Sequence, residues 1–275
     1  MTKRYRHFRK WDLVVLGICV LVLVSCLGAI GAQGRRRAKA AVCLANLQRW
    51  GSMFQSYMDD HDGHFNPGWD VGATELWMNA LRPYYQDRWP LLLCPTATRL
   101  AEPDAEWRTF AAWSRVTAVP GGGSQLYVSS YGINSWTNHM TSSRGARVEE
   151  WFWGTAENVE TPGNVPVFGD AMWHDAWPLE TDTPLSLPVD LGGGTGGIGS
   201  EMNLFCIDRH GGGVNMLFMG WSARKVGLKE LWRLEWHRGY DTYGPWTMGG
   251  GVQASDWPEW MRGYKDYPQD ERGPR

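Results

Sequence analysis

A run of 21 residues without a charged side chain, from Leu13 to Gln33, constrains this chain more strongly than any other feature. Leu, Val and Ile dominate the run. A helix that rises about 1.5 Å per residue would cross a hydrocarbon core of about 30 Å over this length. A core helix of a soluble protein is rarely apolar for so long, so the sequence predicts a membrane span over residues 12–34.

The helical pattern continues beyond this span but becomes amphipathic. Apolar side chains recur three or four positions apart, with polar residues such as Gln48 and Arg49 between them. No proline interrupts residues 12–62, and the first strong stop signal is Asp62-Gly63. We therefore expect one continuous helix of about 50 residues, whose amphipathic part, residues 38–62, packs against a folded domain. The apolar stripe consists of Cys43, Leu44, Leu47, Trp50, Phe54, Tyr57 and Met58.

Charged residues are distributed unevenly along the chain. Residues 1–40 hold nine of the 27 basic side chains and one of the 29 acidic ones, which leaves 18 basic and 28 acidic side chains in residues 41–275. A body this acidic lacks the clustered positive face that nucleic acid requires, so no nucleic-acid partner is expected. The basic residues that flank the predicted span suit lipid headgroups instead.

The expected topology is a single pass through the inner membrane. Five basic residues precede the span and four follow it closely, so their distribution alone does not decide the orientation. A short N-terminus and a large downstream domain favour a cytoplasmic basic segment at residues 1–11. The domain at 35–265 is then periplasmic or extracellular, and residues 266–275 are expected to form a flexible tail.

The exported domain is predicted to combine short helices, strands and long irregular loops. Thr74 can cap a short helix that Pro83 stops, and residues 228–240 have near-helical apolar spacing. Residues 101–164 are rich in turn residues and predict irregular packing. The predicted fold class is α+β, with the long N-terminal helix packed on a small antiparallel sheet. Strands are expected at 165–170, 202–207, 214–219 and 222–226.

Three of the five cysteines belong to this domain. Cys43 and Cys94 either form a disulfide, if the compartment is oxidising, or remain two buried free thiols. Cys206 lies in an apolar run and is expected to be a core residue. The chain has no Cys-x-x-Cys pair, so the usual spacing for zinc, haem attachment and thioredoxin-type redox chemistry is missing.

Acidic residues gather where the long helix is expected to end. Asp59, Asp60 and Asp62 offer oxygen donors that could hold calcium, although the spacing is not that of an EF-hand loop. A solvated helix C-terminus explains the same residues equally well. No other cofactor is predicted.

A second polar cluster is expected around a glycine-rich turn. Cys206, Asp208 and His210 would share one face of a regular strand, which suggests a nucleophile, but no oxyanion-forming turn accompanies them. The preferred interpretation is a structural cluster in which His210 bonds to a carboxylate such as Asp170. The protein is therefore not expected to be an enzyme.

Several short motifs occur in an order that resembles a known family. After the apolar helix and a basic cluster come Cys-x-x-Asn-Leu, Tyr-x-Asp-Asp-x-Asp-Gly, Cys-Pro, Ser-Tyr-Gly-x-Asn, Gly-Asp and Arg-His-Gly-Gly. This order resembles the type II secretion pseudopilin-like proteins, in particular the branch abundant in planctomycetes that is associated with prepilin-type processing. The matching residues are Cys43, Asn46, Leu47, Tyr57, Asp59, Asp60, Asp62, Gly63, Cys94, Pro95, Ser130, Tyr131, Gly132, Asn134, Gly169, Asp170, Arg209, His210, Gly211 and Gly212.

The resemblance implies a pilin-like fold and a non-catalytic function as a membrane-anchored subunit or accessory of a type II secretion or surface-filament system. The implied partners are the lipid bilayer and other pilin-like subunits or secretion-system components. Counting back from Cys43 aligns Phe8 with the family's first mature residue and Asp12 with its helix-start Glu, whereas His7 stands in place of the Gly that precedes cleavage. These three residues are the candidates for processing and assembly.

Two alternatives remain open at the sequence level. Leu23-Val24-Ser25-Cys26 matches a lipobox, which would make Cys26 a lipidated N-terminus. In addition, the chain has 18 tryptophans, many of them in irregular segments. They favour hydrophobic anchoring of loops, but a lipid- or membrane-anchored polysaccharide-binding protein is the alternative function, with Trp173 and Trp177 as its test residues.

Overall fold

The computed structural model describes residues 10–70, 72–86, 88–97, 99–100, 108–140, 147–191 and 200–268, without the side chains of 23–30, 70, 73, 99, 100 and 191. The chain divides into two compact units, residues 1–39 and residues 40–275, and each is described by itself. The second unit is a mixed domain of helices and sheets, so the predicted α+β class is confirmed.

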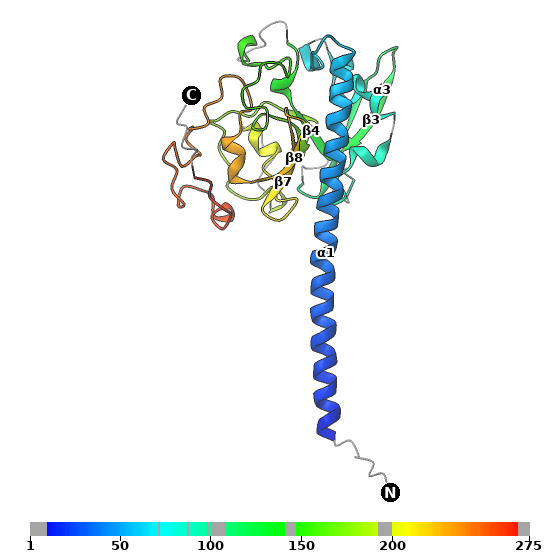
Figure 1. Ribbon diagram of the computed structural model, residues 1–275, viewed down its shortest axis with the longest axis vertical. Coiled ribbons are helices and arrows are strands. Elements are labelled where there is room, and N and C mark those ends of the chain that lie inside the picture. The colour runs from blue at the N-terminus through cyan, green and yellow to red at the C-terminus, as the bar shows by residue number, and fades with distance from the viewer. Residues whose placement is uncertain are drawn as a thin grey trace. The chain divides into compact units, whose positions relative to one another are not determined.

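Helix α1 (Lys10–Asp59) runs without a break for 50 residues, as the absence of proline predicted (Figure 1). It ends where the sequence placed the stop signal, because Asp62 and Gly63 take positive φ angles of 53° and 79°. The Gly63 N–H then bonds back to the Met58 carbonyl at 2.9 Å and satisfies one of the last helical carbonyls.

No helix among the described residues is both long enough and apolar enough to cross a membrane. The span predicted over residues 12–34 includes residues 23–30, whose side chains lie outside the described part of the chain.

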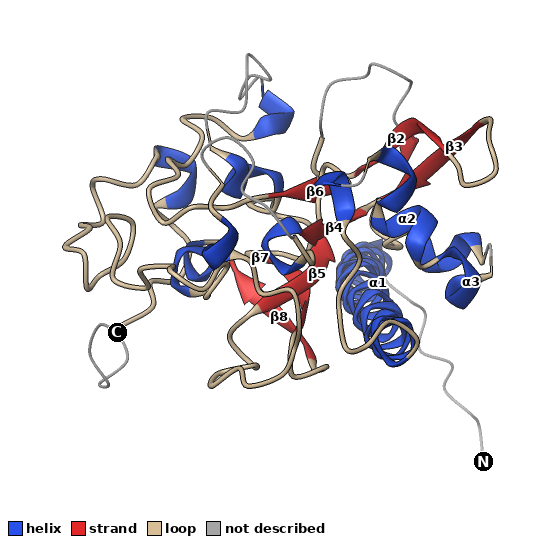
Figure 2. Ribbon diagram, turned by 90° about the horizontal axis from the view of Figure 1, so that it is seen from above, coloured by secondary structure: helices blue, strands red, loops and turns tan. Residues whose placement is uncertain are grey.

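The central sheet has five strands in the order β6-β4-β5-β7-β8 (Figure 2). All neighbours are antiparallel except β4 and β6. The expected strands at 165–170, 214–219 and 222–226 correspond to β5, β7 and β8, so this part of the prediction is correct. The strands are β4 (Tyr131–Asn134), β5 (Pro166–Asp170), β6 (Asp175–Ala176), β7 (Gly213–Phe218) and β8 (Ala223–Gly227).

A second sheet of three strands lies within residues 99–129, much of which was predicted to be irregular. Strand β1 (Arg99–Leu100) pairs parallel with β2 (Ala111–Ala118), and β2 forms a hairpin with β3 (Ser124–Ser129). The prediction failed because the hairpin inverts the usual pattern: Val116 is 61% exposed, whereas the neighbouring Thr117 is 5% exposed. Alternation of apolar and polar residues therefore gave no strand signal there.

Two hydrophobic clusters cover the two faces of the central sheet. Alternate side chains of a strand point to opposite faces, and in β7 Leu217 joins the cluster formed around α1, whereas Met216 joins the other cluster. We call these the helix-side core and the far-side core. Gly51 of α1 lies so close to β7 that a Cβ atom there would stand 3.1 Å from the Leu217 side chain. The amphipathic part of α1 therefore packs on the sheet, as predicted.

The remaining helices are short, and the sequence predicted them only in part. The helix expected after Thr74 is found as α2, but Thr74 does not cap it, because Leu76 is its N-cap residue. Pro83 lies in the first turn of α3 instead of ending a helix. Residues 202–207 form no strand, because Glu201–Leu204 is a 3-10 helix, whereas the short helix expected within residues 228–240 is found as the 3-10 helix Lys229–Arg233. The α-helices are α2 (Trp77–Ala80) and α3 (Arg82–Tyr85), and the 3-10 helices are Gly68–Asp70, Ala73–Glu75, Trp89–Leu92, Ser135–Thr137, Glu149–Trp151, Val189–Leu191, Glu201–Leu204, Lys229–Arg233 and Glu259–Met261.

Candidate metal centre

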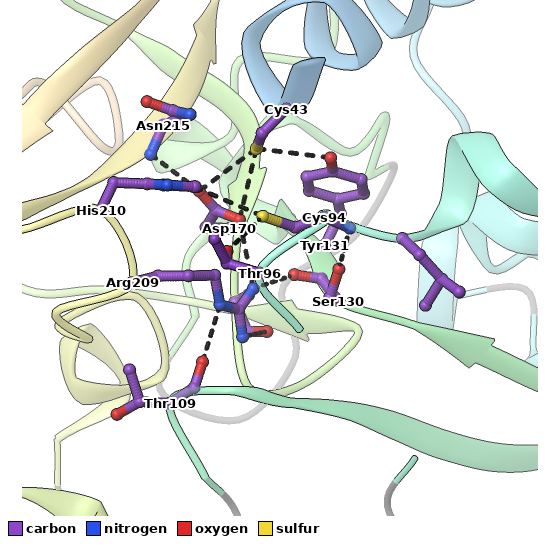
Figure 3. Close-up of polar contacts among 12 residues, drawn as sticks. Cys43, Cys94, Thr96, Thr109, Ser130, Tyr131, Asp170, Arg209, His210 and Asn215 are labelled. Carbon is purple, nitrogen blue, oxygen red and sulfur yellow. Dashed lines mark hydrogen bonds and ion pairs between the residues drawn. The ribbon is translucent and has the colours of Figure 1, made fainter. Parts of the chain in front are cut away.

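Four ionisable side chains from four separate elements meet in the interior of the second unit (Figure 3). Cys43 comes from α1, Cys94 from the loop before β1, Asp170 from the end of β5, and His210 from the turn before β7. One sulfur, nitrogen or oxygen atom from each lies within 4.8 Å of the corresponding atom of every other residue. Among the described residues, this is the place where potential metal ligands converge.

The position of Cys94 follows from the helix that carries Cys43. One turn further along α1, the Asn46 amide donates to the Leu93 carbonyl at 3.3 Å and to the Pro90 carbonyl at 3.4 Å. The Trp50 indole donates to the Leu91 carbonyl at 2.8 Å. The Cys94 N–H donates to Ser130 Oγ at 2.5 Å. The Cys-x-x-Asn motif therefore supplies one thiol and holds the loop that supplies the other.

Asp170 is a fully buried carboxylate with partners on both oxygens. Its Oδ1 accepts a hydrogen bond from the Arg209 guanidinium at 3.2 Å, and its Oδ2 accepts one from the Asn215 N–H at 2.9 Å. Burial acts to raise the pKa of Asp170, but the bond from His210 and the positive charge of Arg209 outweigh it, so the pKa is lowered. The carboxylate is therefore ionised at neutral pH.

Arg209 is also fully buried, and it connects the site to the surrounding strands. Besides Asp170 it donates to four backbone carbonyls, which include Thr109 at 2.8 Å and Ser130 at 2.5 Å. A buried guanidinium needs partners of this kind to offset the loss of its hydration. Arg209 thereby connects the start of β4, through Ser130, with the end of β5, through Ala171. Because Arg209 directly precedes His210, it also holds His210 beside these strands.

His210 reaches the cluster because the chain turns sharply after it. Gly211 and Gly212 take φ angles of 65° and 85°, which side-chain-bearing residues seldom adopt, and Asp208 Oδ1 accepts from the Gly212 N–H at 2.5 Å. His210 Nε2 lies 2.9 Å from Asp170 Oδ2 and 3.4 Å from Cys94 Sγ. Burial lowers the pKa of His210. The hydrogen bonds to Asp170 and Cys94 and the negative charges of these two groups together outweigh burial and raise the pKa to about 9.

The two thiols differ in their surroundings. Burial raises the pKa of Cys94, yet hydrogen bonds from Cys43 and His210 and the charge of Arg209 bring it down to about 6. The pKa of Cys43 is raised, chiefly by burial. Tyr131 donates its hydroxyl to Cys43 Sγ at 3.4 Å, and Thr96 Oγ1 lies 2.9 Å from Cys94 Sγ. Each sulfur therefore has a hydroxyl beside it that can support a thiolate.

The predicted structural cluster is found only in part. His210 bonds to Asp170 as expected, but Asp208 does not join them: its carboxylate accepts from the Gly212 N–H and, at 2.7 Å, from the Tyr264 hydroxyl. Cys206 is buried in the far-side core, and burial raises the pKa of its thiol. The nucleophile arrangement of Cys206 with His210 is therefore not formed. Cys43 and Cys94 are brought together as two buried free thiols, which is one of the two alternatives that the sequence left open.

The other sequence candidates lie elsewhere. Asp59, Asp60 and Asp62 are exposed at the end of α1, where Asp60 accepts a hydrogen bond from the Tyr84 hydroxyl at 2.9 Å. They are not among the ligand groups found in the described residues. Asp12 is exposed in the first turn of α1. His7 and Phe8 lie outside the described residues.

Apart from the contact between His210 and Asp170, the sequence did not predict that the short motifs would form a single site. Residues from five of the motifs that carried the family resemblance converge here, although Cys43 and Asp170 are 127 positions apart in the chain. The signal that could have revealed the site is the chemistry of the motif residues taken together: two thiols, one carboxylate and one imidazole. The motif residues at or beside the cluster are Cys43, Asn46, Cys94, Ser130, Tyr131, Asp170, Arg209 and His210.

Comparison of the chain with protein-family models, with curated proteins and with solved structures finds no match.

Proposed function

We propose that this protein is a membrane-anchored, pilin-like structural subunit or accessory of a type II secretion or surface-filament system. The observation that carries the proposal is that the two parts of α1 have different surroundings. Its C-terminal part belongs to the core of the second unit, whereas the described part of the first unit is helical from Lys10 onwards and exposes apolar side chains between Trp11 and Val22.

The exposed side chains of the first unit need an apolar environment. Trp11 is 76% exposed, Leu13 60% and Leu21 69%, and Val14, Val15, Leu16 and Ile18 are exposed between them. A continuous apolar surface of this kind is stabilised by lipid or by apolar helices of other subunits. The uncharged run from Leu13 to Gln33 is compatible with contact to lipid and with contact to apolar helices of other subunits. In this proposal the protein lies in the inner membrane with its N-terminus cytoplasmic and its C-terminal domain periplasmic or extracellular.

The burial of the polar cluster supports a function without catalysis. Cys43 and Asp170 are 0% exposed and Cys94 is 1% exposed, so a substrate has no direct access to these groups. An enzyme places its reactive groups in an accessible cleft. The cluster therefore fits a role in holding α1 against the sheet.

The proposal is tested by crosslinking full-length protein in its native membrane. Cys19 and Cys26 are first replaced by Ser, and single cysteines are then placed at Val14, Val15, Ile18 and Leu21, which are all on α1. We expect bismaleimide-linked dimers at the positions on one helical face. A cysteine in place of Met248, which is 52% exposed on the second unit, is the control and should stay monomeric. Absence of linked species at every helix position would overturn assembly through α1.

The alternative function, polysaccharide binding, has one specific observation in its favour. A groove of about 820 Å³ is lined by Arg49, Tyr84, Arg88 and Trp89, and Trp89 is 43% exposed. Aromatic faces in open grooves suit sugar rings. Trp177, by contrast, is half-buried, with the Arg147 guanidinium 3.8 Å from its ring centre.

A glycan array distinguishes this alternative. If the protein binds polysaccharide through the groove, Trp89→Ala should abolish the signal, while Trp173→Ala and Trp177→Ala should weaken it little. No binding by the unmodified protein would remove the alternative.

A further inference from the structure

We propose that Cys43, Cys94, Asp170 and His210 bind one zinc ion in a closed tetrahedral site. The site would join α1 to the central sheet as a structural clamp. This inference depends only on the second unit and does not rest on membrane assembly, so the crosslinking experiment can fail without affecting it.

The spacing of the ligand atoms already approximates the edges of a zinc tetrahedron. Zinc lies about 2.3 Å from thiolate sulfur and about 2.0–2.1 Å from imidazole nitrogen or carboxylate oxygen, so a sulfur and a lighter ligand should stand roughly 3.5 Å apart. Cys43 Sγ lies 3.6 Å from both Asp170 oxygens, and Cys94 Sγ lies 3.4 Å from His210 Nε2. His210 Nε2 and Asp170 Oδ2 are closer, at 2.9 Å, because a hydrogen bond joins them directly.

The donor set favours zinc over the other common ions. Thiolate sulfur is a poor ligand for calcium and magnesium, which prefer oxygen, whereas a mixture of sulfur, imidazole and carboxylate suits zinc. All four positions come from the protein, which is the pattern of a structural site rather than of a catalytic site with an open position. The burial of Cys43, Cys94 and Asp170 is consistent with this pattern.

The charges of the site balance when zinc is included. Two thiolates and the Asp170 carboxylate carry three negative charges, and zinc supplies two positive charges. The remaining negative charge is matched by Arg209, which is fully buried and bonds to Asp170 at 3.2 Å. A buried cluster with no net charge avoids the large cost of transferring uncompensated charge out of water.

The groups around the ligands are placed to orient them. Tyr131 donates to Cys43 Sγ, Thr96 Oγ1 contacts Cys94 Sγ, and the Asn215 N–H holds Asp170 Oδ2. Outer partners of this kind fix the direction of metal ligands and tune their basicity. Three of the four ligands therefore have a second partner that is independent of the other ligands.

A disulfide between Cys43 and Cys94 is the competing use of the same sulfurs. It would explain two of the four residues, but not why an imidazole and a carboxylate stabilised by Arg209 converge on the sulfur atoms. Zinc uses all four residues. The two states exclude each other because a disulfide has no thiolate to offer a metal.

The test uses the full-length protein, purified in detergent without an affinity tag and without chelator. Elemental analysis should find about one zinc per chain. Cys43→Ser and His210→Ala should each reduce the bound zinc at least tenfold. Cys206→Ser is the matched control, since it removes a buried thiol from the far-side core, and it should leave the zinc content unchanged.

A second measurement does not depend on how the variants fold. Exchange of the unmodified protein with Co²⁺ should produce the visible bands of tetrahedral cobalt and a near-ultraviolet thiolate-to-cobalt band. The proposal is overturned if neither zinc nor the cobalt bands are found. It is also overturned if the intact mass is two hydrogens below the reduced value and peptide mapping places a Cys43–Cys94 bond, or if Cys43→Ser retains full zinc in a folded protein.

Discussion

Asn134 shows how much of this fold depends on single buried amides. Its side chain is 0% exposed, and its Nδ2 donates to the carbonyls of Pro166 and Trp236, both at 2.8 Å. Its Oδ1 accepts from the Trp136 N–H at 3.2 Å. One residue therefore satisfies three backbone groups from three segments.

Replacement of Asn134 is expected to lower the stability of the protein, by more for Asp than for Ala. Asn134→Ala removes the side-chain partner of the Pro166 carbonyl and of the Trp136 N–H, and it leaves the Trp236 carbonyl with the Trp153 indole alone, so it should lower the free energy of unfolding by about 2–4 kcal/mol. Asn134→Asp should cost more, because a carboxylate oxygen would face two carbonyl oxygens. Urea denaturation followed by tryptophan fluorescence measures both, with the exposed Gln55→Ala as control. Equal stabilities for Asn134→Asp and the unmodified protein would contradict this role.

Asp182 is a buried carboxylate whose ionisation at neutral pH destabilises the folded state. It is 7% exposed, and burial raises its pKa to about 6, although its Oδ2 accepts from the N–H groups of Leu179 and Met202. The nearby charges of Glu201 and Glu180 add to the rise. The folded state therefore holds a proton on Asp182 more tightly than the unfolded state does.

The pH dependence of stability follows from this difference. The contribution of Asp182 is most favourable when it is protonated in both states, below about pH 4, and it declines as the pH rises towards 6. Asp182→Asn should remove this decline. The variant should be about 1–3 kcal/mol more stable than the unmodified protein at pH 7 and show no such gain near pH 4. Denaturation at both values measures the difference, and a gain that is equal at both would refute the assignment.

At the scale of elements, the contact between α1 and β7 determines how the helix-side core closes. Gly51 has no side chain, and a Cβ atom there would lie 3.1 Å from Leu217 Cδ1 and 3.7 Å from the Trp221 carbonyl. The absence of a side chain therefore allows α1 to pack closely on β7 at this turn. Close approach brings Cys43, two turns earlier, within reach of Asp170.

Filling this contact should separate the two elements. Gly51→Val inserts a branched side chain against Leu217 and should destabilise the protein by about 1–3 kcal/mol through overpacking. Gln55→Val places the same side chain on the exposed face of α1 and should change stability by less than about 1 kcal/mol. Thermal unfolding of the two variants compares them directly. If they are equally stable, the helix does not press on β7 at Gly51.

The elements that the sequence predicted correctly are those whose signals are local. The stripe from Cys43 to Met58 and the positive-φ stop at Asp62-Gly63 each lie within one segment, and α1 matches both. The β2–β3 hairpin was missed because β2 exposes Val116 and buries the neighbouring Thr117. There, long-range packing decides burial, and local alternation carries no information about it.

The candidate site was predictable only in fragments. Sequence spacing reveals metal sites whose ligands share one helix or loop, as in a Cys-x-x-Cys pair. Here the ligands come from four elements, and Cys94 and His210 are 116 positions apart. The contact between His210 and Asp170 was anticipated, but the approach of Cys43 and Cys94 to both depends on how α1 packs on the sheet.

At the scale of the whole molecule, the boundary between the two units lies within a single helix. The second unit begins at Ala40, whose carbonyl accepts a hydrogen bond from the Asn215 amide at 3.2 Å. Every residue of the helix-side core and every ligand of the candidate metal centre lies after this point. Helix stability in the second unit therefore comes from packing rather than from the part of α1 that precedes it.

Two truncations test this boundary. Deletion of residues 1–36 keeps Ala40 and residues 37–39 before it. The domain should therefore remain folded, with a free energy of unfolding within about 1 kcal/mol of that of the full chain. Deletion of residues 1–46 removes the fully buried Cys43 from the helix-side core and takes the Asn46 amide away from the Pro90 and Leu93 carbonyls, and it should cost at least about 3–5 kcal/mol. Near-ultraviolet circular dichroism and chemical denaturation distinguish the two products. An unfolded product of the first deletion would show that the units are not separable, since the far-side core and both sheets are retained in it.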